Sequence, residues 1–321
     1  MTDADLDVLT LGMMMGEVVP PRAGAGFGDG RGLVLFPSGS MTIFALALAS
    51  LGARVGLLSR VGDDDLGRWM RTRVEEAGID TEGVTTVAGQ LTPLALASVD
   101  AAGNKSFNYY RFAGISDPLA TLRAADVPDA ALRRARVFDF GEASLRSPVM
   151  RAETLAVAQR ARDLGLAVCY TPNYRASAWS GGAAEAADVQ RAALALADVT
   201  LMNAEESALL SGFPDTSAAA RRIVALGPSV VVITSGREGA IVAMDDEITR
   251  IPAVPVDVVF DIGAGDSFHA GFLAAWLAGG DPLAAARFAA HAAALKISRE
   301  PLPELLPTRD EVMAAMEAAG A

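Results

Sequence analysis

The stretch from Phe260 to Phe272 reads FDIGAGDSFHAGF and carries the most informative pattern in the chain. Gly263 and Gly265, with alanine between them, predict a tight turn, and an apolar helix follows from Asp266. The first N–H groups of a helix have no partner within it, so they favour an anion. A carboxylate there can take a proton from a substrate hydroxyl while the helix end stabilises a phosphoryl group. The structural alternative is an acidic residue that only favours the first helical turn.

Outward from this turn, strand-like runs alternate with segments of helical period, which indicates βαβ units around a mostly parallel sheet. We expect strands at Val8–Leu11, Val55–Ser59, Val137–Phe140, Val168–Tyr170, Val199–Met202 and Val230–Thr234. Helices are expected at Met41–Leu51, Leu66–Ala77, Glu153–Leu164, Ala186–Leu196, Glu205–Ser211, Ala218–Leu226 and Asp266–Leu277. In such a fold helices cover both faces of the sheet, and ligands bind at the carboxyl ends of the strands.

An antiparallel segment interrupts this alternation. Leu94–Val99 and Lys105–Arg111 are extended runs whose connection, residues 100–104, has the composition of a hairpin turn. With the glycine-rich residues 23–32 and Leu33–Phe36, they predict a small sheet that closes over a site as a lid, formed near residues 15–38 and 92–112. A surface hairpin without function is the alternative. Because no linker or repeat divides the chain, we expect residues 1–321 to form one domain, whose lid edge offers a way to form a homodimer.

Composition and charge narrow the classes of partner. The chain has 321 residues, 51% hydrophobic, and a net charge of −12, which argues against disorder, non-specific nucleic-acid binding and anionic membrane surfaces. Cys169, His269 and His291 are its only cysteine and histidines, so an intramolecular disulfide is impossible, zinc lacks ligands, and any metal should bind oxygen. The acidic start and the absence of an apolar run of about 20 residues predict an uncleaved cytoplasmic protein with a small-molecule partner.

The 260–272 stretch resembles the second signature of the PfkB, or ribokinase-like, family of sugar kinases, in which Gly-Ala-Gly-Asp carries the catalytic base. Further segments are similar in the same order along nearly the whole chain: Leu51–Ala53, Arg60–Gly67, Asn203–Glu206, Thr234–Gly239 and Ala289–Ser298. The resemblance implies a ribokinase-like three-layer αβα sandwich, with a mostly parallel central sheet and a small β lid, that uses ATP and Mg²⁺.

The resemblance also assigns roles to residues. The catalytic group is Asp266 with the backbone of Gly263, Ala264 and Gly265. Nucleotide contacts are expected from Asn203, Thr234, Ser235, Gly236, Gly239, Gly265 and His291, and magnesium contacts from Asn203 and Glu206. Asn203 and Glu206 lie one helical turn apart, as a shared oxygen site for a hard cation requires. A capping Asn with a solvent-facing Glu, and an ordinary turn at the two glycines, remain the alternatives.

The substrate side resembles the 2-keto-3-deoxygluconate kinases within this family. Tyr109-Tyr110-Arg111 and Pro172-Asn173-Tyr174-Arg175 are similar to the two segments with which those enzymes hold a sugar acid. Guanidinium groups suit a carboxylate, so this acid is the first expected substrate. A neutral sugar, as for a fructokinase or ribokinase, follows if the arginines only pair with surface acids. The full expected set is Glu17, Gly39, Ser40, Tyr109, Arg111, Asn173 and Arg175.

Departures from the family pattern gather on the sugar side. Ile43 stands where an asparagine usually touches the sugar, and Glu17 where many relatives have Asp. Thr171 and Phe260 also replace acids, and His291 replaces a frequent asparagine. These changes leave open a catalytically weak sugar or nucleotide sensor, although Asp266 is intact. A Rossmann NAD enzyme is excluded because residues 11–16 lack the glycine spacing. We interpret His269 and Cys169 as structural.

Overall fold

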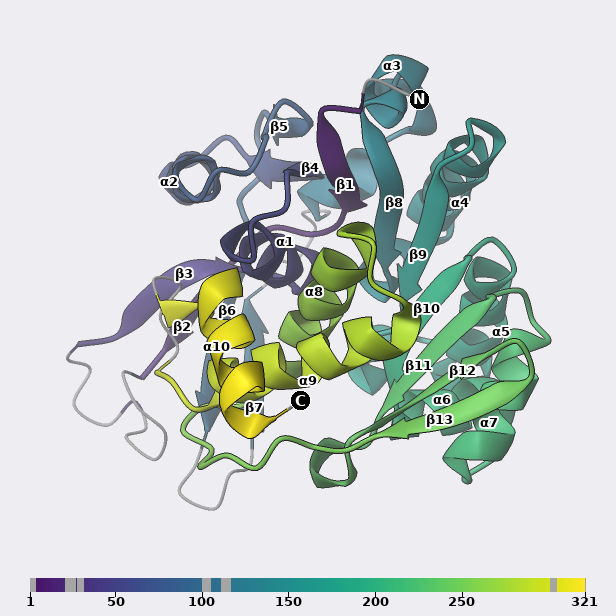
Figure 1. Ribbon diagram of the computed structural model, residues 1–321. Coiled ribbons are helices and arrows are strands. Elements are labelled where there is room, and N and C mark those ends of the chain that lie inside the picture. The colour runs from purple at the N-terminus through teal and green to yellow at the C-terminus, as the bar shows by residue number, and fades with distance from the viewer. Residues whose placement is uncertain are drawn as a thin grey trace.

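The computed structural model describes residues 4–20, 27, 32–99, 105–110, 117–300 and 305–320. Its main sheet has nine strands in the order β13-β12-β11-β10-β9-β8-β1-β4-β5 (Figure 1). The strands that pair in parallel are β1 (Leu6–Leu11), β4 (Val55–Gly62), β5 (Val84–Val87), β8 (Ala135–Gly141), β9 (Ala167–Thr171), β10 (Val199–Asn203) and β11 (Val230–Thr234). All six expected strands are present, each at its predicted place or slightly longer.

Three strands of the main sheet lie beyond the sequence expectations: β5 at one edge, and β12 and β13 at the other end of the sheet. β12 (Ala240–Met244) and β13 (Glu247–Ile251) pair antiparallel with each other, and β12 pairs antiparallel with β11. Their connection is Asp245-Asp246, and both residues have positive φ, 48° and 66°. A two-residue hairpin needs that conformation, but Asp-Asp is a weaker signal for it than Asn-Gly, which explains why the hairpin was missed.

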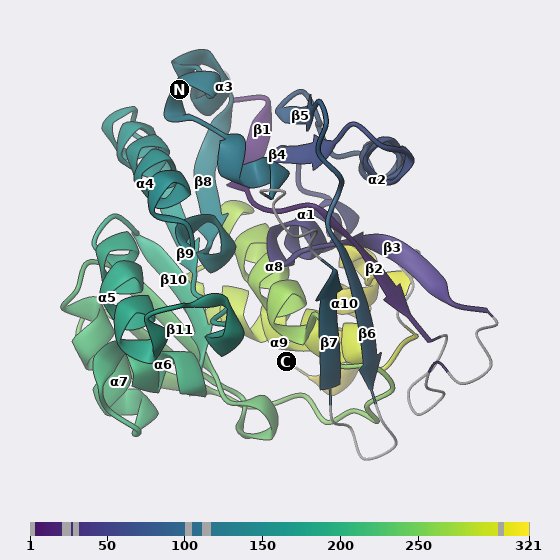
Figure 2. The same ribbon diagram turned by 180° about the vertical axis from the view of Figure 1, so that it is seen from behind.

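Helices cover both faces of the sheet. One layer contains α3 (Asp129–Arg133), α4 (Pro148–Asp163), α5 (Gly182–Leu194), α6 (Ala204–Ser211) and α7 (Thr216–Val224). The other contains α1 (Ser40–Ser50), α2 (Asp65–Glu76), α8 (Ala264–Leu277), α9 (Pro282–Ile297) and α10 (Arg309–Ala319). Within β11, Val231 and Ile233 pack toward the first layer and Val232 toward the second. Because successive side chains of a strand alternate between faces, this burial explains the apolar runs and confirms the three-layer αβα fold (Figure 2).

A second sheet of four strands forms the expected lid. Its strands are β2 (Met15–Val19), β3 (Val34–Ser38), β6 (Leu94–Val99) and β7 (Lys105–Tyr110), in the order β3-β2-β6-β7. The turn at 100–104 and most of the glycine-rich segment lie outside the described residues. Beneath the lid, Phe36 and Ala97 share a hydrophobic cluster with Phe260 and Ile262. The lid therefore packs directly on the segment that precedes α8.

None of the helices in the described part of the chain combines the length and apolar character needed to cross a bilayer.

Candidate active site

The glycine turn gives α8 an open N-terminus. Gly263 caps the helix in the left-handed conformation, with φ 80°, and Asp266 lies in the first turn. No described atom comes within 4 Å of the position that a Cβ on Gly265 would take. The backbone N–H groups at this helix end therefore face space that an anion can approach closely.

The N-terminus of a second helix, α1, contacts the first turn of α8. Ser40, the first residue of α1, donates a hydrogen bond of 2.5 Å from its Oγ to Oδ1 of Asp266. The preceding Gly39 has φ 102°, and a Cβ there would lie 2.0 Å from the carbonyl oxygen of Met13, so only glycine fits. The close approach of α1 to the end of β1 thus brings Ser40 to Asp266.

The environment of Asp266 favours a base. Burial raises the pKa of its carboxyl, and the hydrogen bond from Ser40 and the charges of Arg175, His269 and Lys296 offset part of that rise. A carboxylate with a raised pKa holds a transferred proton more readily than an ordinary aspartate. The geometry thus places a carboxyl group of raised pKa at a helix N-terminus whose N–H groups can approach an anion.

A small pocket with a mostly apolar lining opens beside Ser40. It encloses about 280 Å³, including space open to solvent, where β1 and β8 end. Asn173 lines it with φ 43°, a left-handed conformation that asparagine adopts more readily than most residues other than glycine. The lining residues are Gly12, Met13, Ser40, Met41, Gly141, Glu142, Ala143 and Asn173. Of the expected substrate residues, Ser40 and Asn173 therefore lie together.

Glu17, on strand β2 of the lid sheet, has a carboxyl group that is unusual in being buried. Its side chain is buried, and Oε2 accepts a 2.7 Å hydrogen bond from Ser38. Oε1 has no hydrogen-bond partner among the described residues. Burial raises the pKa of Glu17; the Ser38 hydrogen bond lowers it, and the nearby charge of Asp266 raises it again. Glu17 thus has one buried oxygen whose capacity to accept a hydrogen bond is unused among the described residues.

The other expected sugar contacts are more exposed. Arg175 donates from its guanidinium to the Tyr174 carbonyl at 3.0 Å, and its charge lowers the pKa values of Asp266, Glu17 and Glu206. Tyr109 is 41% exposed on β7, with its ring stacked on Phe107 at 6.2 Å between centroids. Arg111 lies outside the described residues.

Asn203 and Glu206 cap α6. The Asn203 side chain accepts from the Glu206 N–H at 2.9 Å, and Glu206 Oε2 accepts from the Asn203 N–H at 2.9 Å. The capping alternative is thus correct for Asn203, but Glu206 is buried rather than solvent-facing. Its Oε1 accepts from the Tyr174 N–H at 2.8 Å, which ties α6 to the loop after β9. Burial raises the Glu206 pKa, and these two backbone N–H groups lower it.

The expected nucleotide residues occupy a turn and a helix. Ser235 and Gly239 close the turn between β11 and β12 with a 2.7 Å backbone hydrogen bond. A Cβ on Gly239 would lie 2.1 Å from the Ile251 carbonyl oxygen, whereas the same position on Gly236 meets open space. The plain turn is therefore present at Gly239, and Gly236 leaves room for a ligand. Thr234 ends β11, and His291 is buried on α9, where Nδ1 donates to the Arg287 carbonyl at 2.9 Å.

A buried polar chain behind the site is absent from the sequence expectations. Thr10 Oγ1 donates to Asp139 at 2.7 Å, the other Asp139 oxygen lies 3.3 Å from His269 Nε2, and His269 Nδ1 is 3.0 Å from Thr171 Oγ1. Asp139, Cys169 and His269 hold their ligand-type atoms within 4.8 Å of one another. Burial raises the pKa of the Cys169 thiol well above its usual value. The only sequence signal was the position of His269, one turn after Asp266.

The comparisons with known proteins agree with this geometry. Residues 8–309 match the model of the pfkB family carbohydrate kinases. A fructokinase from Klebsiella pneumoniae is 31% identical over 258 residues, 79% of this chain and 81% of that protein. The crystal structure of a PfkB protein from Polaromonas sp. JS666 covers 96% of this chain and 99% of its own, with 28% identity and a TM-score of 0.85.

A structure from E. coli described as ribokinase II in complex with ATP and Mg²⁺ shares the fold, with a TM-score of 0.85 at 24% identity over 98% of this chain and 99% of that one. The family match spans most of the chain and includes the glycine turn, Asp266 and the cap of α6. This chain therefore belongs to the pfkB family of carbohydrate kinases.

Proposed function

We propose that this carbohydrate kinase transfers the γ-phosphoryl group of ATP to a hydroxyl of a small neutral sugar, with a ketohexose such as fructose as the first choice. The observation that supports this best concerns Asp266, which lies at an open helix N-terminus and accepts a hydrogen bond from Ser40, a residue that lines a small pocket. The name of the Klebsiella relative supports the sugar class.

In the proposed reaction, a sugar hydroxyl lies between the pocket and Asp266. Asp266 takes the hydroxyl proton as that oxygen bonds to the γ-phosphorus and the bond from phosphorus to the ADP oxygen breaks. The N–H groups of Ala264 and Gly265 stabilise the charge on the phosphoryl oxygens, as donors at a helix end do. Ser40, which already donates a hydrogen bond to Asp266, orients the carboxylate.

Asn203 and Glu206 are the proposed magnesium side of the site. Their amide and carboxylate oxygens are the ligand type that Mg²⁺ prefers, and Asn203 is exposed. Each Glu206 oxygen already accepts one backbone N–H, so contact through water leaves the cap intact. Mg²⁺ bound with ATP would withdraw charge from the phosphates. We place the nucleotide along Thr234, Ser235 and Gly236, with His291 beside it.

A sugar acid such as 2-keto-3-deoxygluconate is the second candidate. Arg175 favours it, because the guanidinium lies near enough to three carboxyl groups to lower their pKa values. A cation in that position can hold a substrate carboxylate. The names of the relatives, which are fructokinases, support the neutral sugar as the first candidate.

The test is Mg²⁺-dependent release of ADP from ATP across neutral ketoses and aldoses, 2-keto-3-deoxy sugar acids and nucleosides. We expect turnover with a neutral ketose, and Asp266→Asn should reduce kcat by about 100- to 10 000-fold while ATP still binds. Turnover with the sugar acid alone would move the second candidate to first place. Binding of sugar and ATP without turnover would replace the enzyme proposal with a sensor.

A further inference from the structure

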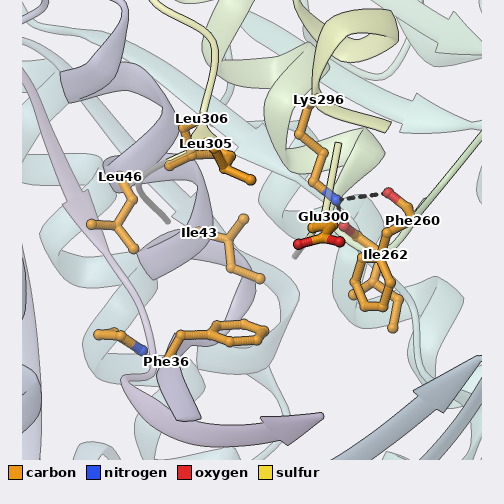
Figure 3. Close-up of a pocket in the computed structure, with 10 residues that line it drawn as sticks. Phe36, Ile43, Leu46, Phe260, Ile262, Lys296, Glu300, Leu305 and Leu306 are labelled. Atoms are coloured by element: carbon orange, nitrogen blue, oxygen red, sulfur yellow. Dashed lines mark hydrogen bonds between the residues drawn. The ribbon is translucent and has the colours of Figure 1, made fainter. Parts of the chain in front are cut away.

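A buried lysine lies behind the glycine turn. Lys296, in the last turn of α9, is 9% exposed, and its ammonium points at the segment before α8 (Figure 3). Nζ donates to the carbonyl oxygen of Phe260 at 3.2 Å and also to that of Ile262. A Cβ on Gly263, the cap of α8, would lie 3.7 Å from Nζ. The ammonium is therefore in direct reach of the turn that presents the phosphoryl-binding N–H groups.

Two carbonyl oxygens that converge on one point need a positive partner. In a buried site they otherwise repel each other and lack hydrogen bonds, which is unfavourable. A lysine ammonium is a compact charge with three donors, whereas the planar fork of arginine suits carboxylates. Lys296 is one of only two lysines, with Lys105, among 27 basic residues.

The same segment is tied to α9 by its backbone. The N–H groups of Val259 and Phe260 both donate to the Ile297 carbonyl, at 2.8 and 3.0 Å. Together with the Lys296 contacts, these bonds fix the chain up to the residue before Gly263. The orientation of the α8 N-terminus thus depends on the end of α9.

The charge of Lys296 also reaches the acids of the site. It lowers the pKa values of both Asp266 and Glu17. A fixed positive charge on this side favours the ionised base before the transfer and the negative phosphoryl oxygens during it.

We propose that Lys296 is a positioning residue that serves as a built-in cation for the phosphoryl-binding turn. It holds the Phe260 and Ile262 carbonyls so that Gly263 keeps its left-handed conformation and the N–H groups of Ala264 and Gly265 face the γ-phosphoryl group. This role rests on the proposed kinase function. It implies that the enzyme needs no added monovalent cation to order this turn.

The cavity beside Lys296 makes the idea testable by chemical rescue. It encloses about 510 Å³, including space open to solvent, and is lined by apolar side chains together with Lys296 and Glu300 (Figure 3). The lining residues are Phe36, Pro37, Ile43, Leu46, Phe260, Ile262, Lys296, Glu300, Leu305 and Leu306. In Lys296→Ala this space extends to the two carbonyls, so a small ammonium ion can enter.

The experiment compares the unmodified chain with Lys296→Met, Lys296→Ala and the control Lys105→Ala. We expect Lys296→Met to lower kcat by about ten- to a hundredfold, as happens when a group that orients the ligands of a metal site is removed, with a smaller change in KM for the sugar. Methylammonium should restore kcat and raise the Tm of Lys296→Ala, while neutral acetamide and tetramethylammonium should do neither. The unmodified chain should show no response to K⁺ or ammonium.

Each contrary result is decisive. Unchanged kcat in Lys296→Met overturns the positioning role, and so does a folded Lys296→Ala that methylammonium neither activates nor stabilises. A requirement of the unmodified chain for K⁺ overturns the built-in cation. The Tm response needs no sugar or turnover, so it separates failure of this inference from failure of the kinase proposal.

Discussion

The proposed phosphoryl side and the proposed sugar side of the site are held in different ways. At the start of α8 and α6, polar groups are fixed by backbone hydrogen bonds and by the buried side chains Lys296, Glu206 and His269. On the sugar side, Arg175 and Tyr109 are exposed. We infer from this difference that the groups proposed for phosphoryl transfer are held rigidly between the sheet and the helices. We propose that recognition uses strand ends and the lid, where substitutions of exposed residues such as Arg175 and Tyr109 cost little stability, whereas Glu17 is buried.

The largest loss of stability should follow from a substitution in the row of buried polar side chains that contains His269. His269→Leu keeps the side-chain bulk but removes the ring nitrogen that lies 3.0 Å from Thr171 Oγ1 and the one that lies 3.3 Å from Asp139 Oδ1. The loss of the Thr171 contact alone should cost about 1–3 kcal/mol. Urea unfolding measures the loss. His269→Gln, which retains polar atoms, is the matched control and should lose less. If His269→Leu were as stable as the unmodified protein, the buried polar side chains would not be what holds the proposed phosphoryl side rigid.

An intermediate effect on stability is expected at Glu17, which lies on β2 of the lid sheet near the charge of Asp266. Its pKa is raised in the folded protein, so between the ordinary value of 4.5 and the raised value the folded state binds more protons than the unfolded state. Stability attributable to Glu17 is therefore present below this window and falls as pH rises through it. Glu17→Gln removes that fall and should be more stable than the unmodified chain above the window, with little difference at its acid end.

Chemical unfolding at several pH values, together with KM for the sugar, tests Glu17 from both directions. We expect the stabilised Glu17→Gln to bind sugar more weakly, because the unpartnered Oε1 is the proposed acceptor for a sugar hydroxyl. An identical pH profile for the two proteins would contradict the buried, raised-pKa carboxyl. An unchanged KM would remove Glu17 from the sugar contacts.

The smallest effect on stability is expected at Arg175. Because its side chain is exposed, Arg175→Ala should change the free energy of unfolding by no more than about 0.5 kcal/mol. Its effect on KM separates the two substrate classes: an acid sugar should lose far more affinity than a neutral one. Steady-state kinetics with one sugar of each class provides the measurement, and equal shifts for both would withdraw the carboxylate-binding role.

Local patterns predicted the fold because they report which faces of each element are buried. The alternation of strands and helices predicted the parallel sheet, since Val231 to Ile233 must satisfy helices on two sides. The β12–β13 hairpin was missed because its Asp-Asp turn is a weak local signal. For Asn203 and Glu206, sequence spacing fitted both a metal site and a cap, and only burial showed that Glu206 faces inward.

The sequence by itself determined the family, the glycine turn and Asp266, because a tight turn, a helix start and a carboxylate are encoded within a few adjacent residues. Only the tertiary structure decided which distant side chains serve them. Ser40 meets Asp266, and Lys296 meets the Phe260 and Ile262 carbonyls, because strand order and helix packing bring α1 and α9 to the start of α8. No local sequence pattern encodes these contacts, because each depends on where the sheet places elements that are far apart in the chain.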